Sequence, residues 1–74
     1  MGGVKDVWNG VFNLNHTVYV EYAHAYTERQ AWFIICNRIA RKKGVHPKMV
    51  MNYFGGKKDN YKIRKEIEFK QEEA

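Results

Sequence analysis

The sequence predicts a small α+β protein in which a β-hairpin, a long α-helix, a short second helix or strand and a closing strand form an antiparallel sheet with the long helix on one face. Alternation at 17–25 is typical of a strand, and the helix pattern at 27–43 has clear ends. Valine occurs seven times and Leu14 is the only leucine, which favours a sheet over a helical bundle. At 74 residues we expect one compact domain, 1–74, with a thin core.

Residues 4–12 predict the first strand of the hairpin. Their apolar side chains fall at helical spacing, but Asn9 and Gly10 weaken a helix, and residues 13–16 could form the turn. The second strand, 17–25, is rich in β-branched and aromatic residues. Its alternation divides the side chains into two faces, one with Val18, Val20 and Tyr22 and the other with Tyr19, Glu21 and Ala23.

The helix pattern at 27–43 is marked at both ends. Thr27 followed by Gln30 is a capping box, and Tyr26 can pack against Ala31. Basic residues at 41–43 suit the last turn, and Gly44 suits the left-handed position that follows. At 100° per residue one arc is expected to face the sheet, and it holds Trp32, Phe33, Ile35, Cys36, Ile39 and Ala40.

Two interpretations remain open for residues 45–54. The alternation of Met49, Met51 and Tyr53 is consistent with a strand, whereas Pro47 and the spacing of Val50 to Phe54 are consistent with a short helix. Residues 61–70 alternate cleanly and predict the closing strand, although pairs such as Lys62 with Glu66 would also suit a helix. The last residues, 66–74, are acidic and are expected to form a frayed tail.

Most of the positive charge lies in one block of the sequence. Residues 38–65 hold ten Lys and Arg against the single Asp59, a net charge of +9, whereas the whole chain carries +5. A block of this kind is typical of a surface that contacts a polyanion, and equally of a solvated face.

Residues 39–54, IARKKGVHPKMVMNYF, resemble the helix-turn-helix of bacterial repressors. In that pattern Ala40 is the small residue between two helices and Gly44 is the turn glycine, while Val45, Val50 and Tyr53 hold the second helix. The resemblance implies a recognition helix over 47–54 that brings to the major groove Pro47, Lys48, Met49 and Met51. Because methionine cannot make the bidentate hydrogen bonds that read a base, sequence specificity is expected to be minor.

The sequence gives little support to an enzyme. It contains no serine, and Cys36 lies on the predicted buried arc, where a thiol is protonated and inert. His16 and His24 lie about 26 Å apart along a strand, which is too far to ligate one ion. We therefore predict no catalytic residue, no metal site and no cofactor.

Two functions compete. The first is a non-enzymatic nucleic-acid-binding accessory protein that uses the basic block on the phosphate backbone. The second is a protein-binding adaptor or inhibitor, of the kind found in phages and mobile elements, that docks on a larger protein or nucleoprotein complex through the same face and exposed Ile and Met residues. The candidate contact residues are Arg38, Arg41, Lys42, Lys43, Lys48, Lys57, Lys58, Ile34, Met49 and Met51.

The expected setting is the cytoplasm. A single cysteine cannot form an intrachain disulfide, the first residues do not resemble an export signal, and no apolar run is long enough for a membrane span. A homodimer is possible, because so small a core can be completed by a second copy.

Overall fold

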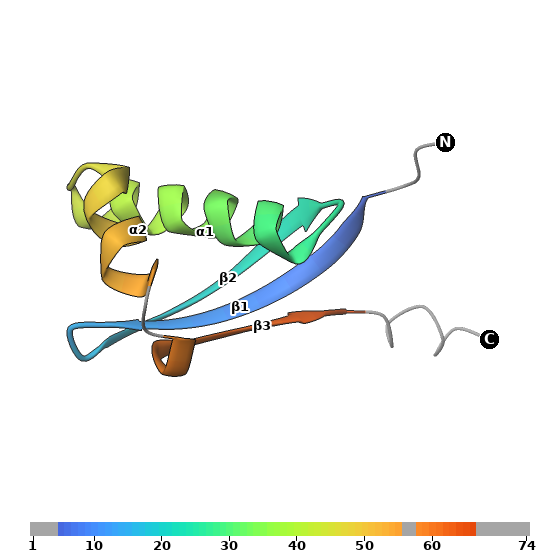
Figure 1. The fold of residues 1–74 in the computed structure, drawn as a ribbon, viewed down its shortest axis with the longest axis horizontal. Coiled ribbons are helices and arrows are strands. Elements are labelled where there is room, and N and C mark those ends of the chain that lie inside the picture. Colours follow the sequence, from blue (N-terminus) through green and yellow to red (C-terminus); the bar gives the residue numbers. More distant parts are fainter. Residues whose placement is uncertain (1–4, 56–57, 67–74) are drawn as a thin grey trace.

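The predicted α+β fold is confirmed by the computed structural model, which describes residues 5–55 and 58–66. A three-stranded antiparallel sheet has the order β2-β1-β3, and both helices lie on the same side of it (Figure 1). The elements in chain order are β1 (Asp6–Leu14), β2 (Thr17–Ala25), α1 (Glu28–Lys43), α2 (Pro47–Gly55), a 3-10 turn (Lys58–Asn60) and β3 (Tyr61–Lys65).

The first two strands form the predicted hairpin. They pair in continuous register from Asp6 with Ala25 to Leu14 with Thr17. The turn is tighter than the four residues expected: it consists of Asn15 and His16, whose φ angles are 49° and 69°. Two consecutive residues with positive φ are typical of a type I′ turn, whose twist matches that of the flanking strands.

Alternation gives the sheet an inner face toward the helices and an outer face away from them. The two side-chain sets predicted for β2 are confirmed, and Glu21 and Ala23 lie on the buried inner face. Val18, Val20 and Tyr22, the more apolar set, lie on the outer face and are more than half exposed. The inner face of β1 supplies Trp8, Phe12 and Leu14 to the core.

Both predicted ends of α1 are confirmed. The Thr27 hydroxyl accepts a hydrogen bond from the backbone N–H of Gln30 at 3.2 Å. The side-chain oxygen of Gln30 accepts one from the backbone N–H of Tyr26 at 2.8 Å. At the other end Gly44 has a φ of 76° and its N–H donates to the carbonyls of Ala40 and Arg41. These bonds satisfy backbone groups that a helix end leaves without partners.

The buried stripe of α1 is shifted from the predicted arc. It consists of Ala31, Ile35, Cys36, Ile39 and Ala40. The prediction was wrong for Phe33, which is 37% exposed, and Trp32 is only partly buried. At 100° per residue Phe33 lies just outside the stripe, while Trp32 lies within it but borders a cavity beside β3.

Residues 47–55 form a helix, so the strand interpretation of 45–54 was wrong. Val50 and Phe54 are four residues apart and both are buried, whereas strand alternation would have put them on one face with Asn52, which is exposed. Pro47 occupies the first helical position, and the His46 ring accepts a hydrogen bond from the Lys48 amide at 3.0 Å. The Phe54 ring meets Phe12 edge to face, with ring centres 5.0 Å apart.

The closing strand is confirmed over Tyr61–Lys65. It pairs with β1, and the Tyr61 ring stacks on Phe12 with ring centres 5.0 Å apart. The Glu66 amide donates to the Val7 carbonyl at 2.9 Å and continues the pairing by one residue. The predicted continuation to residue 70 and the acidic tail, apart from Glu66, lie outside the described residues.

Candidate functional site

Two of the predicted phosphate-binding residues neutralise a buried acid. Glu21 is 6% exposed on the inner face of β2. The Lys42 ammonium donates to one of its oxygens, and the Arg38 guanidinium lies 3.7 Å from the other. Arg38 also donates to the Tyr22 carbonyl. Because a buried carboxylate without a cation is costly, these two side chains have a role within the fold.

Three other predicted cations are free of ion pairs within the described part of the chain. Arg41, Lys43 and Lys48 are exposed around the end of α1 and the first turn of α2. The Lys42 side chain, although bound to Glu21, remains 55% exposed between them. We call Arg41, Lys42, Lys43 and Lys48 the basic end. It lies at the same end of the molecule as the hairpin turn, because Lys43 and Asn15 line one small hollow there.

The basic block of the sequence does not form one surface. Lys62 and Arg64 pair with Val11 and Asn9 of β1 on the outer face of the sheet, opposite the helices. The Lys65 ammonium lies 3.6 Å from an Asp6 oxygen. Lys57 and the side chain of Lys58 lie outside the described residues. The cations that are contiguous in sequence are therefore divided between the two sides of the sheet.

Only one of the three predicted apolar anchors is exposed. Met49 is 61% exposed on α2, as predicted. Ile34 and Met51 are partly buried and pack against the core, so the prediction of exposure was wrong for both. Met51 follows Val50 on a helix rather than alternating on a strand, which turns it partly toward the core.

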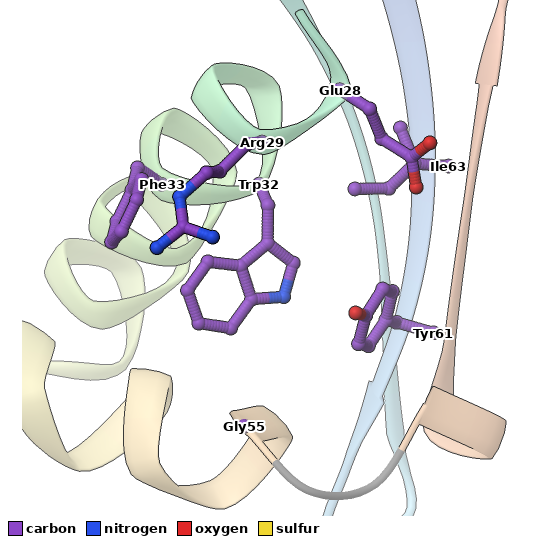
Figure 2. A pocket seen from close by; sticks show the side chains of 7 residues that line it. All are labelled: Glu28, Arg29, Trp32, Phe33, Gly55, Tyr61 and Ile63. Atoms are coloured by element: carbon purple, nitrogen blue, oxygen red, sulfur yellow. The ribbon is translucent and has the colours of Figure 1, made fainter.

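A cavity of about 380 Å³ lies between α1, the end of α2 and β3 (Figure 2). Its polar groups are Glu28, Arg29 and the hydroxyl of Tyr61, whose pKa is raised by burial and by the Glu28 carboxylate. Among the described residues the buried Trp32 indole N–H has no hydrogen-bond partner, and it faces Tyr61. The remaining wall is formed by Phe33, Gly55 and Ile63.

Cys36 is a packing residue. Its side chain is fully buried, and burial raises the pKa of the thiol to about 12. A thiol that is protonated at neutral pH and inaccessible to solvent is a poor nucleophile. Within the described ranges, no group of three or more His, Cys, Asp or Glu is placed to hold a metal ion.

Comparisons of the chain with protein-family models, with curated proteins and with solved structures gave no match. Among the helices that the structure describes, none is both long and apolar enough to cross a membrane.

The outer face is the surface that sequence reasoning did not single out. Asn9, Tyr22 and Arg64 form one cross-strand row there, yet none was predicted as a contact residue. In the sequence, Lys62 and Arg64 alternate with Tyr61 and Ile63. This alternation was the available signal that the two cations lie on the face opposite the core. The information that was missing was which face of the hairpin the helices cover.

Proposed function

We propose that this chain is a small, non-enzymatic nucleic-acid-binding accessory protein that contacts the phosphate backbone through the basic end. The observation that carries the proposal is the charge imbalance there. Four cations are exposed, while Glu21, the acid that contacts this region within the described residues, is buried and already neutralised. An incoming phosphate would therefore meet a surface of one sign.

The chemistry of the basic end favours backbone contact over base reading. Lys and Arg that neutralise phosphates release condensed counterions, so three or four contacts predict a slope of roughly −3 in log K against log salt concentration. The exposed Met49 beside Lys48 offers apolar contact but no donor for a base edge. The resemblance of 39–54 to a repressor helix-turn-helix supports α2 as the helix nearest a duplex.

The test is a titration against labelled single- and double-stranded DNA and RNA at low and near-physiological salt. The test variant is Lys43→Glu/Lys48→Glu, which reverses two cations that have no ion pair in the described part of the chain. Lys42 is left unchanged because an acid there would face the buried Glu21. The matched control is Lys5→Glu/Arg29→Glu, which changes the net charge equally. Arg29 lies fourteen positions before Lys43, about 21 Å along α1.

Salt-sensitive binding that the test variant loses and the control variant retains would support the basic end as the contact surface. Equal losses in both variants would mean that net charge alone drives association, and would contradict the proposed site. Absence of binding at low salt would overturn the nucleic-acid proposal. A preference for one duplex sequence would show that α2 reads bases.

The second candidate is a protein-binding adaptor or inhibitor, favoured by Met49. This side chain is the most exposed large apolar residue of the described chain and borders a hollow of about 130 Å³ beside Val45 and Tyr53. An interface anchored on methionine would weaken little with salt, in contrast to phosphate binding. Either function is proposed for the cytoplasm, where the single buried thiol of Cys36 needs no partner.

A further inference from the structure

The outer face of the sheet is an ordered apolar surface that nothing in the described chain covers. Val11, Val18, Val20 and Tyr22 are 42%, 59%, 54% and 51% exposed, and all four lie on this face. Monomeric proteins scatter exposed apolar residues, whereas a contiguous group of them is typical of an interface.

Both edge strands of the sheet carry features that disfavour the addition of a further strand. On β2, Arg38 donates to the Tyr22 carbonyl and so occupies a backbone acceptor. The other edge strand, β3, has only five residues, three of them Lys or Arg. Short, charged edge strands resist pairing with a further strand. These features favour a partner that stacks on the outer face over one that adds a strand.

Cross-strand register arranges the outer face in rows. One row runs from His24 through Val7 to Glu66, because the Glu66 amide bonds to the Val7 carbonyl. The Glu66 carboxylate lies on this face, where it accepts a hydrogen bond from Asn9 at 2.9 Å. The next row contains Tyr22, Asn9 and Arg64, and the row after that Val20, Val11 and Lys62.

We propose that a second copy of this chain covers the outer face, related to the first by a two-fold axis parallel to β1. Under such an axis each row of one copy faces the same row of the other copy. β2 of each copy then lies opposite β3 of the other. It places Tyr22 of one copy over Arg64 of the other, and His24 over Glu66. The first pair is a cation and an aromatic ring, and the second brings an imidazole to a carboxylate. Val11 meets Val11 at the centre.

This self-complementarity is the reason for choosing a second copy over a nucleic acid. Lys62 and Arg64 could attract a phosphate to this face, but Glu66 would be left without a complement, whereas in the dimer it meets His24. An axis perpendicular to the strands would instead stack β3 on β3 and bring Lys62 and Arg64 near their own copies. Stacked sheets lie about 10 Å apart, with interdigitating side chains such as valine at the core.

The dimer is expected to dissociate on dilution. A face made of two nine-residue strands and one five-residue strand measures at most about 30 by 14 Å, or roughly 400 Å², which is smaller than the roughly 800 Å² per partner of a standard interface. The first measurement is sedimentation equilibrium over roughly three decades of concentration from the low micromolar range, where the average mass should rise from monomer toward dimer.

The test variant is Val11→Gln/Val20→Gln, which leaves the net charge unchanged and would bury amides without partners in the interface. We expect it to stay monomeric at least tenfold beyond the concentration at which the wild type is half dimeric. The control, Met49→Gln, changes a more exposed apolar residue on the helix side and should dimerise like the wild type. Far-UV circular dichroism confirms that each variant is folded.

A short bis-maleimide crosslinker tests the axis. Two Val11→Cys side chains would face each other at the centre of the interface and should crosslink at the concentrations where dimer forms, while Met49→Cys should not. The native Cys36 is fully buried and does not react. A wild type that is monomeric at every concentration, or a dimer that Val11→Gln/Val20→Gln leaves intact, would overturn the proposal. This inference does not depend on the proposed function.

Discussion

Glu21 is the residue whose environment accounts for most of the charge arrangement in this protein. It faces inward from β2, so its carboxylate leaves water and needs a cation within reach. α1 supplies two, Arg38 and Lys42, four residues apart on one side of the helix. The ion pairs thereby tie an edge strand to the helix and remove part of the basic block from the free surface.

We expect an asymmetry between the two halves of this ion pair. Glu21→Gln removes the buried charge, keeps the side-chain shape and frees a half-exposed Lys42, so it should lower the free energy of unfolding by only about 1 kcal/mol. Lys42→Met leaves the buried carboxylate with Arg38 alone and should cost more. Urea unfolding of both single variants and of the double variant measures the difference. A loss in the double variant equal to the sum of the two single losses would show that Glu21 gains little from Lys42.

Burial of the Cys36 thiol makes the stability of the protein decrease with pH in the alkaline range. The thiol pKa is about 12 in the folded chain against an ordinary value of 9.0, so between these two pH values the folded state holds a proton that the unfolded state releases. The free energy of unfolding should therefore fall as the pH rises above 9.0. The raised pKa of Tyr61 acts in the same direction.

Urea unfolding at about pH 8 and about pH 10.5 should show a smaller loss of stability for Cys36→Ala than for the wild type, although the variant is less stable at both values. Ellman's reagent should react with the wild type only as fast as the protein opens. Fast reaction in the folded state would contradict the buried environment of the thiol.

For the secondary-structure elements, features that depend on neighbouring residues were predictable from the sequence, whereas features that depend on distant contacts were not. The ends of α1 were predictable because Thr27, Gln30 and Gly44 act through bonds to neighbouring residues. The helix at 47–55 was not decided by its own pattern, since nine residues are too few to separate the two periods. Its conformation is selected by packing, chiefly of Phe54 on Phe12, which is distant in sequence.

The contact between β1 and α1 depends on a missing side chain. Gly10 lies on the inner face, and a Cβ there would be 2.7 Å from the Ile35 Cδ1 and 2.8 Å from the Phe12 ring. Both neighbours are fully buried, so neither can move freely. Gly10→Ala should therefore destabilise the protein by about 1–3 kcal/mol, although alanine suits a strand better than glycine.

Ile35→Val removes the methyl group nearest to that new Cβ, so the two changes should be less costly together than the sum of their separate effects. Thermal or urea unfolding of the four members of this double-mutant cycle provides the measurement. Additive losses would show that Ile35 does not limit the approach of the strand to the helix.

For the whole molecule, the sequence predicted a layer of helix on sheet but not the side on which each cation would lie. The charge count alone predicted one basic surface from residues 38–65. Strand pairing instead places Lys62 and Arg64 on the outer face, while Lys43 and Lys48 lie at the basic end. The orientation of the hairpin decides this, and in the observed orientation Trp8, Phe12 and Leu14 enter the core while Glu21 meets its partners on α1. That pairing joins residues too far apart for periodicity to detect.

The two proposals, taken together, predict how binding depends on the length of the nucleic acid. A two-fold axis parallel to β1 leaves both basic ends at the same end of the dimer, on the outer helix layers. With about 10 Å for each contact between layers, they lie on the order of 30 Å apart, close to one turn of duplex DNA. A duplex of about two turns can engage both basic ends, whereas one of under a turn engages only one.

At low salt the wild type should therefore bind the longer duplex more tightly than the short one, by at least tenfold more than the larger number of binding sites explains. The monomeric variant Val11→Gln/Val20→Gln should lose this gain and bind the short duplex with wild-type affinity. Fluorescence anisotropy with both duplexes measures it. An equal gain in the variant would mean that the dimer does not place its basic ends on one duplex, whereas a loss on the short duplex would place the outer face itself in contact with nucleic acid.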